Sequence, residues 1–404
     1  MTASADSAAL AAADKSAERR ALAVGCGAHA LHDGYTDLIY VMLPIWQHEF
    51  GLGFAALGLM KTVFSGTLAG FQIPAGLLAE RFGAAAVLAL GTALAGLGYV
   101  LAGFSAGLAF LVAALFVGGL GCSTQHPLAS SLIAHAFAGP RSLKALGTYN
   151  FAGDIGKMTL PAAAALLFVA LPWRHGLMLL GGLGVVAAAA IFVTMPRFAA
   201  ETSTPRKAED APAGGGRLRS YGFPLLLSVG VIDSATRMAF LTFLPFVLAA
   251  KGASLPTIGG ALTLVFAGGA AGKLVCAFIG ARIGAVATVW LTEAVTALGI
   301  VALLPLPLDA ALFLLPVVGV ALNGTSSVLY GSVPDLVAPE RRQRAFGIFY
   351  TGTIGSGAVS PALYGLLGDA VGVPSALTVV AAVVLLTLPI TWALRPALAN
   401  GPAL

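Results

Sequence analysis

Charged residues are scarce in this sequence. Only 10% of the 404 residues are Asp, Glu, Lys or Arg, whereas 58% are hydrophobic, and the mean hydropathy is +0.92. An ordinary soluble domain contains about 25% charged residues, and a soluble chain with so little charge would expose large apolar patches and aggregate. The composition therefore argues against a soluble protein and indicates an integral membrane protein.

Several functional motifs are also missing. The three cysteines, Cys26, Cys122 and Cys276, lie in apolar segments without the spacing of metal ligands, so we expect free thiols, no bound metal and no cofactor. There is no Walker-type Gly-x-x-x-x-Gly-Lys-[Ser/Thr] motif, which argues against ATP as the energy source. There is no nucleic-acid-binding motif, and the net charge of +5 arises from basic residues between the apolar segments.

Long apolar segments are abundant. A membrane-spanning helix needs ~20 predominantly apolar residues, and cutting the sequence at charges, prolines and glycine clusters leaves twelve segments of suitable length. The predicted spans are 21–46, 55–80, 85–104, 107–135, 144–170, 174–195, 221–249, 255–281, 285–307, 310–337, 345–368 and 374–394.

A polar segment divides these spans into two groups of six. Its residues, 197–220, are rich in Arg, Lys, Glu, Asp, Pro and Gly. With the N-terminus inside, 16 of the 22 Lys and Arg residues lie on the inner side, two lie outside and four lie within spans. The positive-inside rule then places both termini in the cytoplasm. We predict a tail (1–20), a bundle (21–196), a linker (197–220), a bundle (221–394) and a second tail (395–404).

The two groups of spans resemble each other in sequence. Glycines and an arginine recur at a constant offset of 201 positions over the first helices of each half, and at an offset of 200 further on. A parallel repeat of six helices predicts a substrate site between the halves, near the bilayer midplane. The pairs include Gly51 and Gly252, Arg81 and Arg282, Gly83 and Gly284, and Pro161 and Pro361.

The loop after the second span carries a recognisable motif. It reads Gly76-Leu-Leu-Ala-Glu80-Arg81-Phe-Gly83 and resembles the Gly-x-Leu-x-Asp-Arg-x-Gly loop of the major facilitator superfamily; Pro339-Glu340-Arg341-Arg342 resembles a later loop of that family. The resemblance implies an all-α membrane protein with twelve transmembrane helices in two six-helix bundles. It also implies a cytoplasmic gate that involves Gly76, Glu80, Arg81, Gly83 and Arg282.

Two shorter stretches resemble a narrower group. His29-x-x-x-Asp33 and the segment from Gly119 to Ser130, which contains His126, resemble the fosmidomycin-resistance branch of drug exporters. That resemblance implies efflux of a drug-like compound by antiport. The fifth span departs from it because Asp154 and Lys157 stand where uncharged residues are expected, and this extra charge counts against a drug-like substrate.

Ionisable residues within the spans are the candidates for function, because burying charge in a membrane is costly. In the first span His29, Asp33 and Asp37 are spaced i, i+4, i+8 and share a face, which Tyr40 extends. A carboxyl group in an apolar cavity can exchange protons near neutral pH. We therefore predict Asp33, Asp37, His29 and Asp154 as proton-coupling residues, although they could instead form a hydrogen-bonded packing cluster.

Other buried polar residues are candidates for substrate binding. In the seventh span Asp233 precedes Arg237 by four residues, so the two either neutralise each other or hold an anionic group. We expect Lys61 to reach an interface, Lys273 either to reach an interface or to take part in the site, and Glu293 to be structural or at the lipid interface. The predicted substrate-binding set is Arg237, Asp233, His126, Lys157, Asn150, Tyr40, Asn323 and Tyr350.

The sequence thus predicts a secondary active transporter of the cytoplasmic membrane that works by alternating access, is not an enzyme and functions as a monomer. We expect proton-coupled efflux of a drug-like or small organic compound. Proton-coupled uptake of an organic anion is the alternative, favoured by Lys157, Arg237 and Lys273. A membrane sensor that does not transport is a possibility from another class.

Overall fold

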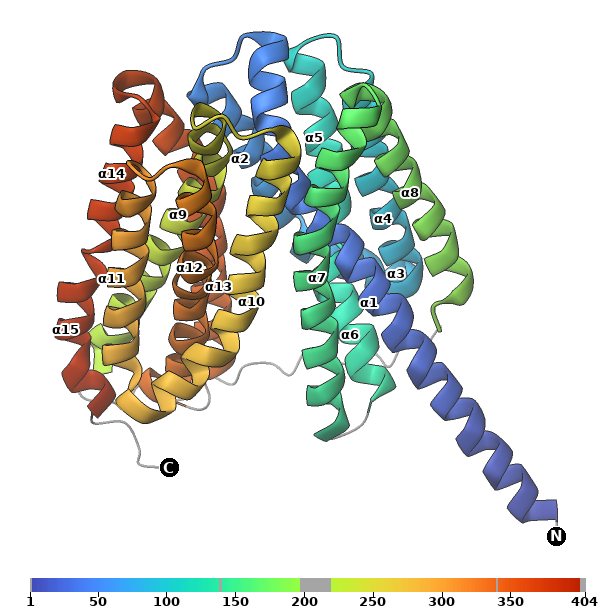
Figure 1. The fold of residues 1–404 in the computed structure, drawn as a ribbon. Coiled ribbons are helices and arrows are strands. Elements are labelled where there is room, and N and C mark those ends of the chain that lie inside the picture. Colours follow the sequence, from blue (N-terminus) through green and yellow to red (C-terminus); the bar gives the residue numbers. More distant parts are fainter. Residues whose placement is uncertain (1, 138–139, 197–218, 339–340, 400–404) are drawn as a thin grey trace. The chain divides into compact units, whose positions relative to one another are not determined.

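The computed structural model describes residues 2–137, 140–196, 219–338 and 341–399, and these residues form helices without any strand (Figure 1). The helices are α1 (Thr2–Phe50), α2 (Phe54–Gly70), α3 (Gln72–Phe82), α4 (Ala84–Gly103), α5 (Leu108–Cys122), α6 (Gln125–Ala136), α7 (Pro140–Ala170), α8 (Trp173–Thr194), α9 (Arg219–Ala250), α10 (Leu255–Ile283), α11 (Ala285–Leu303), α12 (Leu308–Leu336), α13 (Arg342–Val371), α14 (Val373–Val384) and α15 (Thr387–Ala399).

Each predicted span corresponds to one helix or to one consecutive pair. The pairs are α2 with α3, α5 with α6, and α14 with α15. Among the described residues nine segments are long and apolar enough to cross a membrane, or ten when the bent pair α2–α3 is counted as one. α1 and α13 are long but less apolar, because they carry many polar residues. The all-α membrane fold expected from the sequence is confirmed.

Proline explains the three breaks within spans. In α3, α6 and α15 the third residue is a proline, namely Pro74, Pro127 and Pro389. Proline has no N–H group to bond the carbonyl four residues earlier, and its ring crowds that carbonyl. The chain therefore breaks or bends just before it, by 43° between α2 and α3. Prolines alone did not indicate these breaks in the sequence, since Pro161 and Pro361 lie inside continuous helices.

The contacts divide the chain into two units. The first contains residues 1–39 and 63–203, and the second contains residues 40–62 and 204–404. The outer part of the first predicted bundle, 40–62, thus packs with the second unit, whereas the sequence divides the chain only at the linker. Residues 197–218 of that linker, and Pro339 and Glu340 of the second motif, lie outside the described residues. The domain boundaries drawn from sequence remain a prediction.

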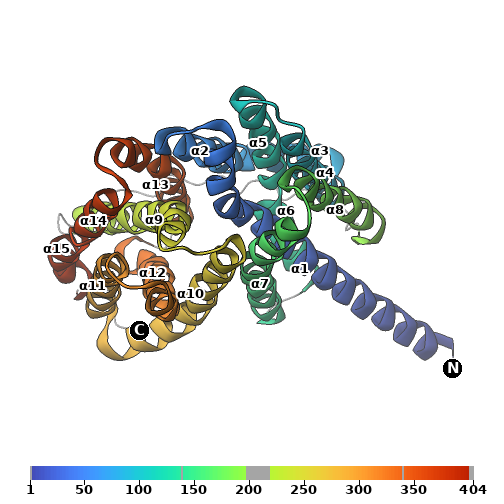
Figure 2. The ribbon, with the colours of Figure 1, turned by 45° about the horizontal axis from the view of Figure 1, so that its top comes forward.

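Small residues allow the helices of each unit to pack closely. In the first unit α4 packs against α8 and α5, and Gly96 of α4 meets Gly181 and Gly184 of α8 so closely that a Cβ atom would not fit. In the second unit α10 packs against α12, and α9 lies beside α13, α14 and α15 (Figure 2). Close approach of backbones at small residues is a common way for membrane helices to associate, because lipid tails compete with larger apolar side chains.

The internal repeat is visible in the backbone. Gly51 and Gly83 have positive φ angles of 62° and 87°, and their partners 201 positions later, Gly252 and Gly284, have φ angles of 85° and 83°. Residues with a Cβ atom rarely adopt these angles. Gly83 and Gly284 end α3 and α10 in the same way, each donating its N–H to the carbonyl four residues earlier. The repeated glycines are therefore retained for the same conformational reason.

A carboxylate caps one helix of the second unit. Asp369, in the last turn of α13, accepts hydrogen bonds from the backbone N–H groups of Phe54 (2.6 Å) and Ala55 (2.9 Å) at the start of α2. An acid is unfavourable at a helix C-terminus and favourable at an N-terminus. The position of Asp369 at the end of α13 is therefore explained by α2, whose first two N–H groups it satisfies. Gly53 leaves room for this contact.

Replacing Asp369 should weaken this packing. We expect Asp369→Ala to destabilise the protein by about 1 kcal/mol, the usual cost of losing a helix cap, measured as a lower apparent Tm in detergent. Asp335→Ala is the matched control, since Asp335 is an exposed acid in the last turn of α12. Equal melting temperatures for the two variants would show that the cap contributes nothing.

Candidate functional site

Three side chains surround Asp33 of α1 in the first unit. Its Oδ2 atom lies 3.4 Å from His29 Nε2 and 3.2 Å from Lys157 Nζ, and its Oδ1 atom lies 3.8 Å from His126 Nε2. His29 is one helical turn before Asp33, as the i, i+4 spacing predicts. The structure therefore brings together four of the residues predicted from the sequence, which come from α1, α6 and α7.

The hydrogen bonds of His29 define where its proton lies. His29 Nδ1 is 2.8 Å from the backbone carbonyl oxygen of Tyr149, and a carbonyl can only accept. Nδ1 must therefore carry a hydrogen, so Nε2 of a neutral His29 has only a lone pair. That lone pair faces the carboxylate of Asp33. Two acceptors 3.4 Å apart repel each other unless a proton lies between them, on His29 or on Asp33.

The stacking of His29 holds this arrangement in place. Its ring lies parallel to that of Tyr149 at a centroid distance of 4.0 Å, and edge-on to that of His126 at 5.2 Å. The Tyr149 hydroxyl in turn contacts Gln125. Sequence analysis missed Tyr149. Its backbone carbonyl accepts the His29 hydrogen bond, and the identity of a residue does not reveal such a backbone contact.

Two local features place His126 and Lys157 beside Asp33. His126 is the second residue of α6, directly after the break caused by Pro127, where Ser123 and Thr124 donate their hydroxyls to carbonyls of the preceding turn. Lys157 is four residues before Pro161, so its carbonyl lacks the usual helical donor. Helix irregularities thus lie next to the charged group on both α6 and α7.

Glycines on α7 allow α1 to approach. A Cβ atom on Gly153 would lie 2.6 Å from Asp33 Oδ2 and 2.8 Å from the His29 ring, and one on Gly156 would overlap the carbonyl oxygen of Ala30. Both contacts are too short for real atoms. The spacing of Gly153, Gly156 and Lys157 on one helix therefore sets the distance between the ammonium group and Asp33.

Exposure differs sharply among the four side chains. Asp33 and His29 are buried, with 9% and 4% of their side chains exposed, whereas Lys157 is 32% exposed and His126 is 47% exposed. Lys157 and His126 can therefore contact a solute directly. Asp33, which both of them contact, is more buried than either.

The other polar residues of the first six spans divide between the units. Asp37 and Asp154 are buried and act electrostatically on Lys157, while the side chain of Asn150 is exposed. Tyr40 packs with the second unit, where its hydroxyl lies 3.3 Å from Met238 Sδ. Lys61 lies 4.3 Å from the centre of the Tyr40 ring and is 1% exposed. The expectation that Lys61 reaches an interface is therefore wrong, because this cation is buried over an aromatic ring.

His32 has a structural contact. Thr92 donates its hydroxyl to the Leu88 carbonyl, so it accepts a hydrogen bond from His32 Nε2 at 2.9 Å. This contact fixes α1 against α4. His29 and His126 lie at the charged cluster, and His32 does not.

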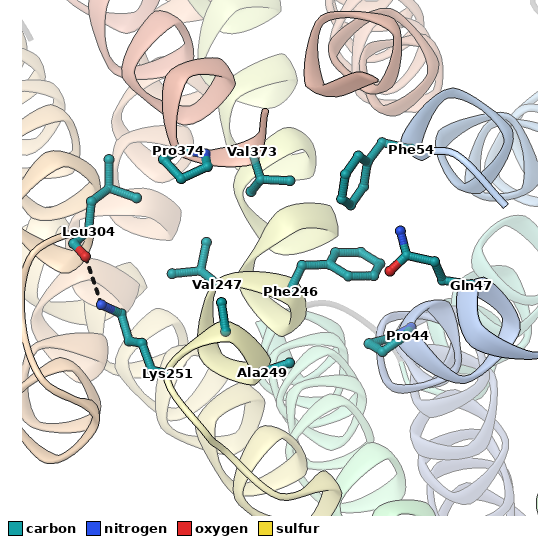
Figure 3. Close-up of a pocket in the computed structure, with 11 residues that line it drawn as sticks. Pro44, Gln47, Phe54, Phe246, Val247, Ala249, Lys251, Leu304, Val373 and Pro374 are labelled. Atoms are coloured by element: carbon teal, nitrogen blue, oxygen red, sulfur yellow. Dashed lines mark hydrogen bonds between the residues drawn. The ribbon is translucent and has the colours of Figure 1, made fainter. Parts of the chain in front are cut away.

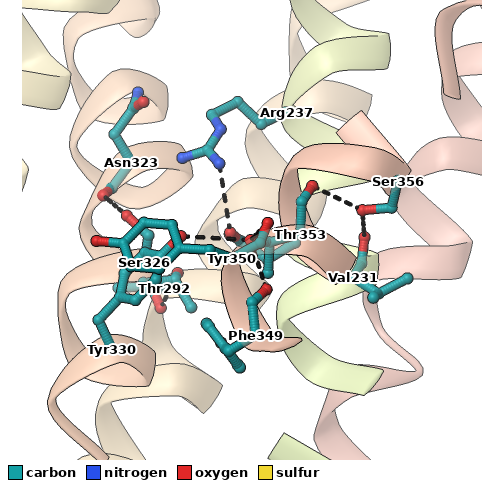
Figure 4. A network of polar contacts seen from close by, with 12 residues as sticks. Val231, Arg237, Thr292, Asn323, Ser326, Tyr330, Phe349, Tyr350, Thr353 and Ser356 are labelled. Atoms are coloured by element: carbon teal, nitrogen blue, oxygen red, sulfur yellow. Dashed lines mark hydrogen bonds and ion pairs between the residues drawn. The ribbon is translucent and has the colours of Figure 1, made fainter. Parts of the chain in front are cut away.

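A second polar cluster lies in the second unit. Arg237 of α9 is 3.9 Å from Asp233, a long distance for an ion pair, and its Nε atom is buried without a hydrogen-bond partner. Arg237 interacts electrostatically with Tyr330 of α12, and Figure 4 draws both together with Asn323 and Tyr350. The Tyr330 and Tyr350 rings are 4.6 Å apart, and the Tyr330 hydroxyl contacts Thr353. Tyr350, predicted from sequence, thus belongs to this cluster through Tyr330, whereas Asn323 contacts Gly319 and Ser326.

Glu293 belongs to this second cluster. It is 1% exposed and interacts electrostatically with Asp233 and Arg237. Of the two alternatives expected for Glu293, structural or at the lipid interface, the second is wrong, because α11 turns this face towards the interior of the unit. Sequence analysis could not predict this, since the apolar α11 gives no indication of which face is buried.

The predicted gate residues lie on exposed helix ends. Glu80, Arg81 and Arg282 have exposed side chains, and Gly83 caps α3. Arg81 lies over the ring of Phe82 at 5.4 Å. These residues form an accessible polar loop in each repeat, and their role in gating remains a prediction.

The His29, Asp33 and His126 side chains also have the donor types of a metal site, since their ligand atoms lie within 4.8 Å of one another. Lys157 argues against that use. Its ammonium group already binds Asp33 Oδ2 at 3.2 Å and would repel a metal cation. The donor set fits protons better than a metal ion.

A separate pocket of about 650 Å³ lies in the second unit and is lined mainly by apolar residues, including Pro44, Phe54, Phe246 and Val373 (Figure 3). Its charged residue, Lys251, donates hydrogen bonds to the carbonyls of Leu304 (2.7 Å) and Leu306 (2.6 Å). Because that ammonium group is already bonded and none of the candidate site residues lines the pocket, we do not assign the substrate to it.

Comparison with known proteins identifies relatives of the chain. The sequence model of the Major Facilitator Superfamily matches residues 26–227 and again residues 225–402, once for each half. The "Probable sulfoacetate transporter SauU" of Cupriavidus necator is 30% identical over 148 residues, which are 36% of this chain and 34% of that protein. The alignment therefore spans about a third of that relative.

Solved structures share the fold. A bacterial homologue of the human lysosomal transporter Spinster, in an inward-facing and occupied conformation, has a TM-score of 0.79 at 15% identity, with 95% of this chain and 98% of that chain covered. The nucleoside transporter NupG has a TM-score of 0.76 at 13% identity, with 94% and 99% covered. At sequence identities this low, the similarity shows a common fold and nothing more.

The close contact between α1 and α7 generates a prediction. Gly156→Ala should push the helices apart, because its Cβ atom would overlap the Ala30 carbonyl, and overpacking of this kind costs about 1–3 kcal/mol. We expect a lower apparent Tm and weaker solute binding. Gly147→Ala on the same helix is the control, since its Cβ atom meets nothing within 4 Å and alanine favours a helix. If the two variants behave alike, the spacing does not determine the site.

Proposed function

We propose a substrate class and a coupling mechanism for this chain, which belongs to the Major Facilitator Superfamily. It is a multi-pass membrane transporter and not an enzyme. We propose that it carries a small organic anion together with protons, by alternating access, in the cytoplasmic membrane with both termini inside. A single chain suffices for this function.

The contact between His29 and Asp33 carries the proposal. Because His29 Nδ1 donates to the Tyr149 carbonyl, Nε2 and the Asp33 carboxylate face each other as two acceptors 3.4 Å apart, and a proton bound by either one relieves their repulsion. The pair is buried, and burial makes the repulsion between unprotonated partners strong. It therefore binds a proton at a defined place, next to the partly exposed Lys157.

Lys157 links this proton to the solute. When the His29–Asp33 pair has lost its proton, the negative Asp33 holds the ammonium group at 3.2 Å. When the pair is protonated, Asp33 no longer competes for Lys157, and the ammonium group binds an anion from the cavity side. Anion and proton thus favour each other's binding, which is the thermodynamic requirement for symport.

The charges support an anionic solute. Each unit contains a partly exposed cation, Lys157 in the first and Arg237 in the second. An ammonium group and a guanidinium fork bind carboxylate, phosphate and sulfonate groups. Sulfoacetate, named for the relative from Cupriavidus necator, has a carboxylate and a sulfonate group. We therefore propose a small carboxylate or sulfonate as the substrate and uptake as the direction.

Efflux of a drug-like compound is the second candidate. It is favoured by the resemblance of the His29-x-x-x-Asp33 and His126-Pro127 segments to drug exporters. Uptake into proteoliposomes separates the two. An inward proton gradient should drive accumulation of sulfoacetate if the anion proposal is correct, whereas an antiporter would lose internal solute along that gradient.

The coupling role of Asp33 is tested by Asp33→Asn. Asparagine keeps the size of the side chain but cannot bind and release the proton. We expect accumulation driven by the pH gradient to be lost, while exchange of internal for external sulfoacetate remains, because Lys157 stays positive and is 32% exposed. Asp309→Asn, at an exposed position of α12, is the control. Gradient-driven uptake by Asp33→Asn at the wild-type rate would exclude Asp33 as the coupling group.

The role of Arg237 is tested by Arg237→Lys. If Arg237 binds an anionic group, lysine replaces a bidentate fork with a point charge and affinity should fall, by roughly 10-fold for 1.4 kcal/mol. If Arg237 only neutralises Asp233, lysine can do the same and affinity should not change. The measurement is Kd for sulfoacetate with protein that elutes as a single species. An unchanged Kd would remove the main support for an anion at Arg237.

A further inference from the structure

We propose that Glu293 is a second proton-binding group, located in the second unit, and that its protonation controls anion binding at Arg237. This inference rests on the proposed proton-coupled transport of an anion. It extends that function by assigning a proton site to the cluster of Arg237 and Asp233. This site is separate from the Asp33 site of the first unit.

The polar neighbours of Glu293 are already engaged. Thr292 donates its hydroxyl to the carbonyl of Thr288 at 3.0 Å, and the Thr325 hydroxyl lies 2.7 Å from Thr292 Oγ1 and 3.3 Å from the Ala321 carbonyl. Thr325 also interacts with the Glu293 carboxyl. A hydroxyl has a single hydrogen, and several acceptors share this one, so Thr325 cannot fully compensate a charge on Glu293.

Burial makes an ionised Glu293 side chain costly. The side chain is 1% exposed, and its Oε1 atom has no hydrogen-bond partner among the described residues. An ionised carboxylate in such a place loses its hydration without full compensation. A structural salt bridge would require a dedicated cation, but Arg237 is shared with Asp233.

The charge balance of the cluster depends on this one proton. Asp233, Glu293 and Arg237 together have a net charge of −1 when all are ionised, and they are neutral when Glu293 is protonated. Arg237 retains a buried Nε without a partner, and 19% of its side chain is exposed. A neutral cluster can therefore accept an anion at Arg237, whereas a negative one repels it.

The groups that act on Glu293 come from two helices, α9 and α12. The groups that act on Glu293 are Asp233 and Arg237 from α9 and the Thr325 hydroxyl from α12. Tyr330 of α12 acts on Asp233 and Arg237. Four helices pack against α11, namely α10, α12, α14 and α15. Their charged residues are Lys273 and Arg282 on α10, Asp309 and Asp335 on α12, and Arg395 on α15.

The consequence is linkage between proton and anion in the second unit. If a proton on Glu293 strengthens anion binding at Arg237, then the anion must raise the proton affinity of Glu293 by the same factor. The second unit thereby pairs one cation with one titratable acid, as Lys157 and Asp33 do in the first. A substrate with two anionic groups would then enter with two protons.

The first test follows the proton on Glu293 itself. Infrared absorption of protonated carboxyl groups is recorded for wild-type protein in lipid bilayers, with ¹³C-labelled glutamate, over a range of pH. Glu293 is the buried one among the described glutamates, so its labelled band should weaken as the pH rises and recover when sulfoacetate is added. Glu293→Gln should remove the band, and Glu49→Gln, at an exposed position, should retain it.

A labelled band that is constant over the whole pH range would overturn the proposal, because Glu293 would then be a permanently neutral packing group. A band that is missing at every pH would also overturn it. This measurement on wild-type protein needs no substitution, so it decides the matter even if Glu293→Gln fails to fold.

The second test counts protons. Sulfoacetate is added to purified protein in weakly buffered solution, and proton uptake is measured with a pH indicator. We expect Glu293→Gln and Asp33→Asn each to take up one proton fewer than wild type. Equal uptake by Glu293→Gln and wild type would contradict the inference. If wild-type protein neither binds sulfoacetate nor takes up protons with it, the proposed function fails, while the infrared titration still decides whether Glu293 exchanges a proton.

Discussion

The high cost of burying charge within a membrane determines the organisation of this protein. With so few charged residues, each one inside a span must have a partner, a proton or a substrate to offset its lost hydration. Asp33 has Lys157, His29 and His126 around it, and Asp233 has Arg237. Neither acid has a partner reserved for it alone: Lys157 is partly exposed and Arg237 is shared with Glu293. This incomplete compensation leaves both clusters able to respond to protons and anions.

The fold was largely predictable because its determinants are local and periodic. Stretches of ~20 apolar residues define membrane spans whatever their neighbours are, and the glycine pairs 51/252 and 83/284 predicted a repeat that reappears as matching positive φ angles. The breaks before Pro74, Pro127 and Pro389 were not predicted. Whether a proline breaks or only bends a helix depends on which tertiary neighbours can satisfy the carbonyl it leaves without a donor, and a single sequence does not contain that information.

The candidate site was predictable only in part, and for a related reason. The spacing of His29 and Asp33 follows from helix geometry, so their contact could be expected. Lys157 reaches Asp33 because Gly153 and Gly156 let two helices touch, and Tyr149 acts through its carbonyl. Lys61 was misplaced, and the alternatives for Glu293 stayed open, because apolar helices give little indication of which face is buried. Contacts between helices, rather than residue types, thus determine which ionisable groups meet.

The two clusters differ in what protects their acids from water. In the first unit the acid is buried next to a lysine that is partly exposed, so in the proposed mechanism a proton on Asp33 changes what Lys157 offers to a solute. In the second unit Glu293 has no cation of its own and interacts electrostatically with Arg237, so in the proposed mechanism its proton changes the net charge around that guanidinium group. The first proposed arrangement links a proton to the release of a side chain, and the second links it to the local electrostatic potential. In the proposal both make anion affinity depend on protonation, but only the first requires a side chain to change its partner.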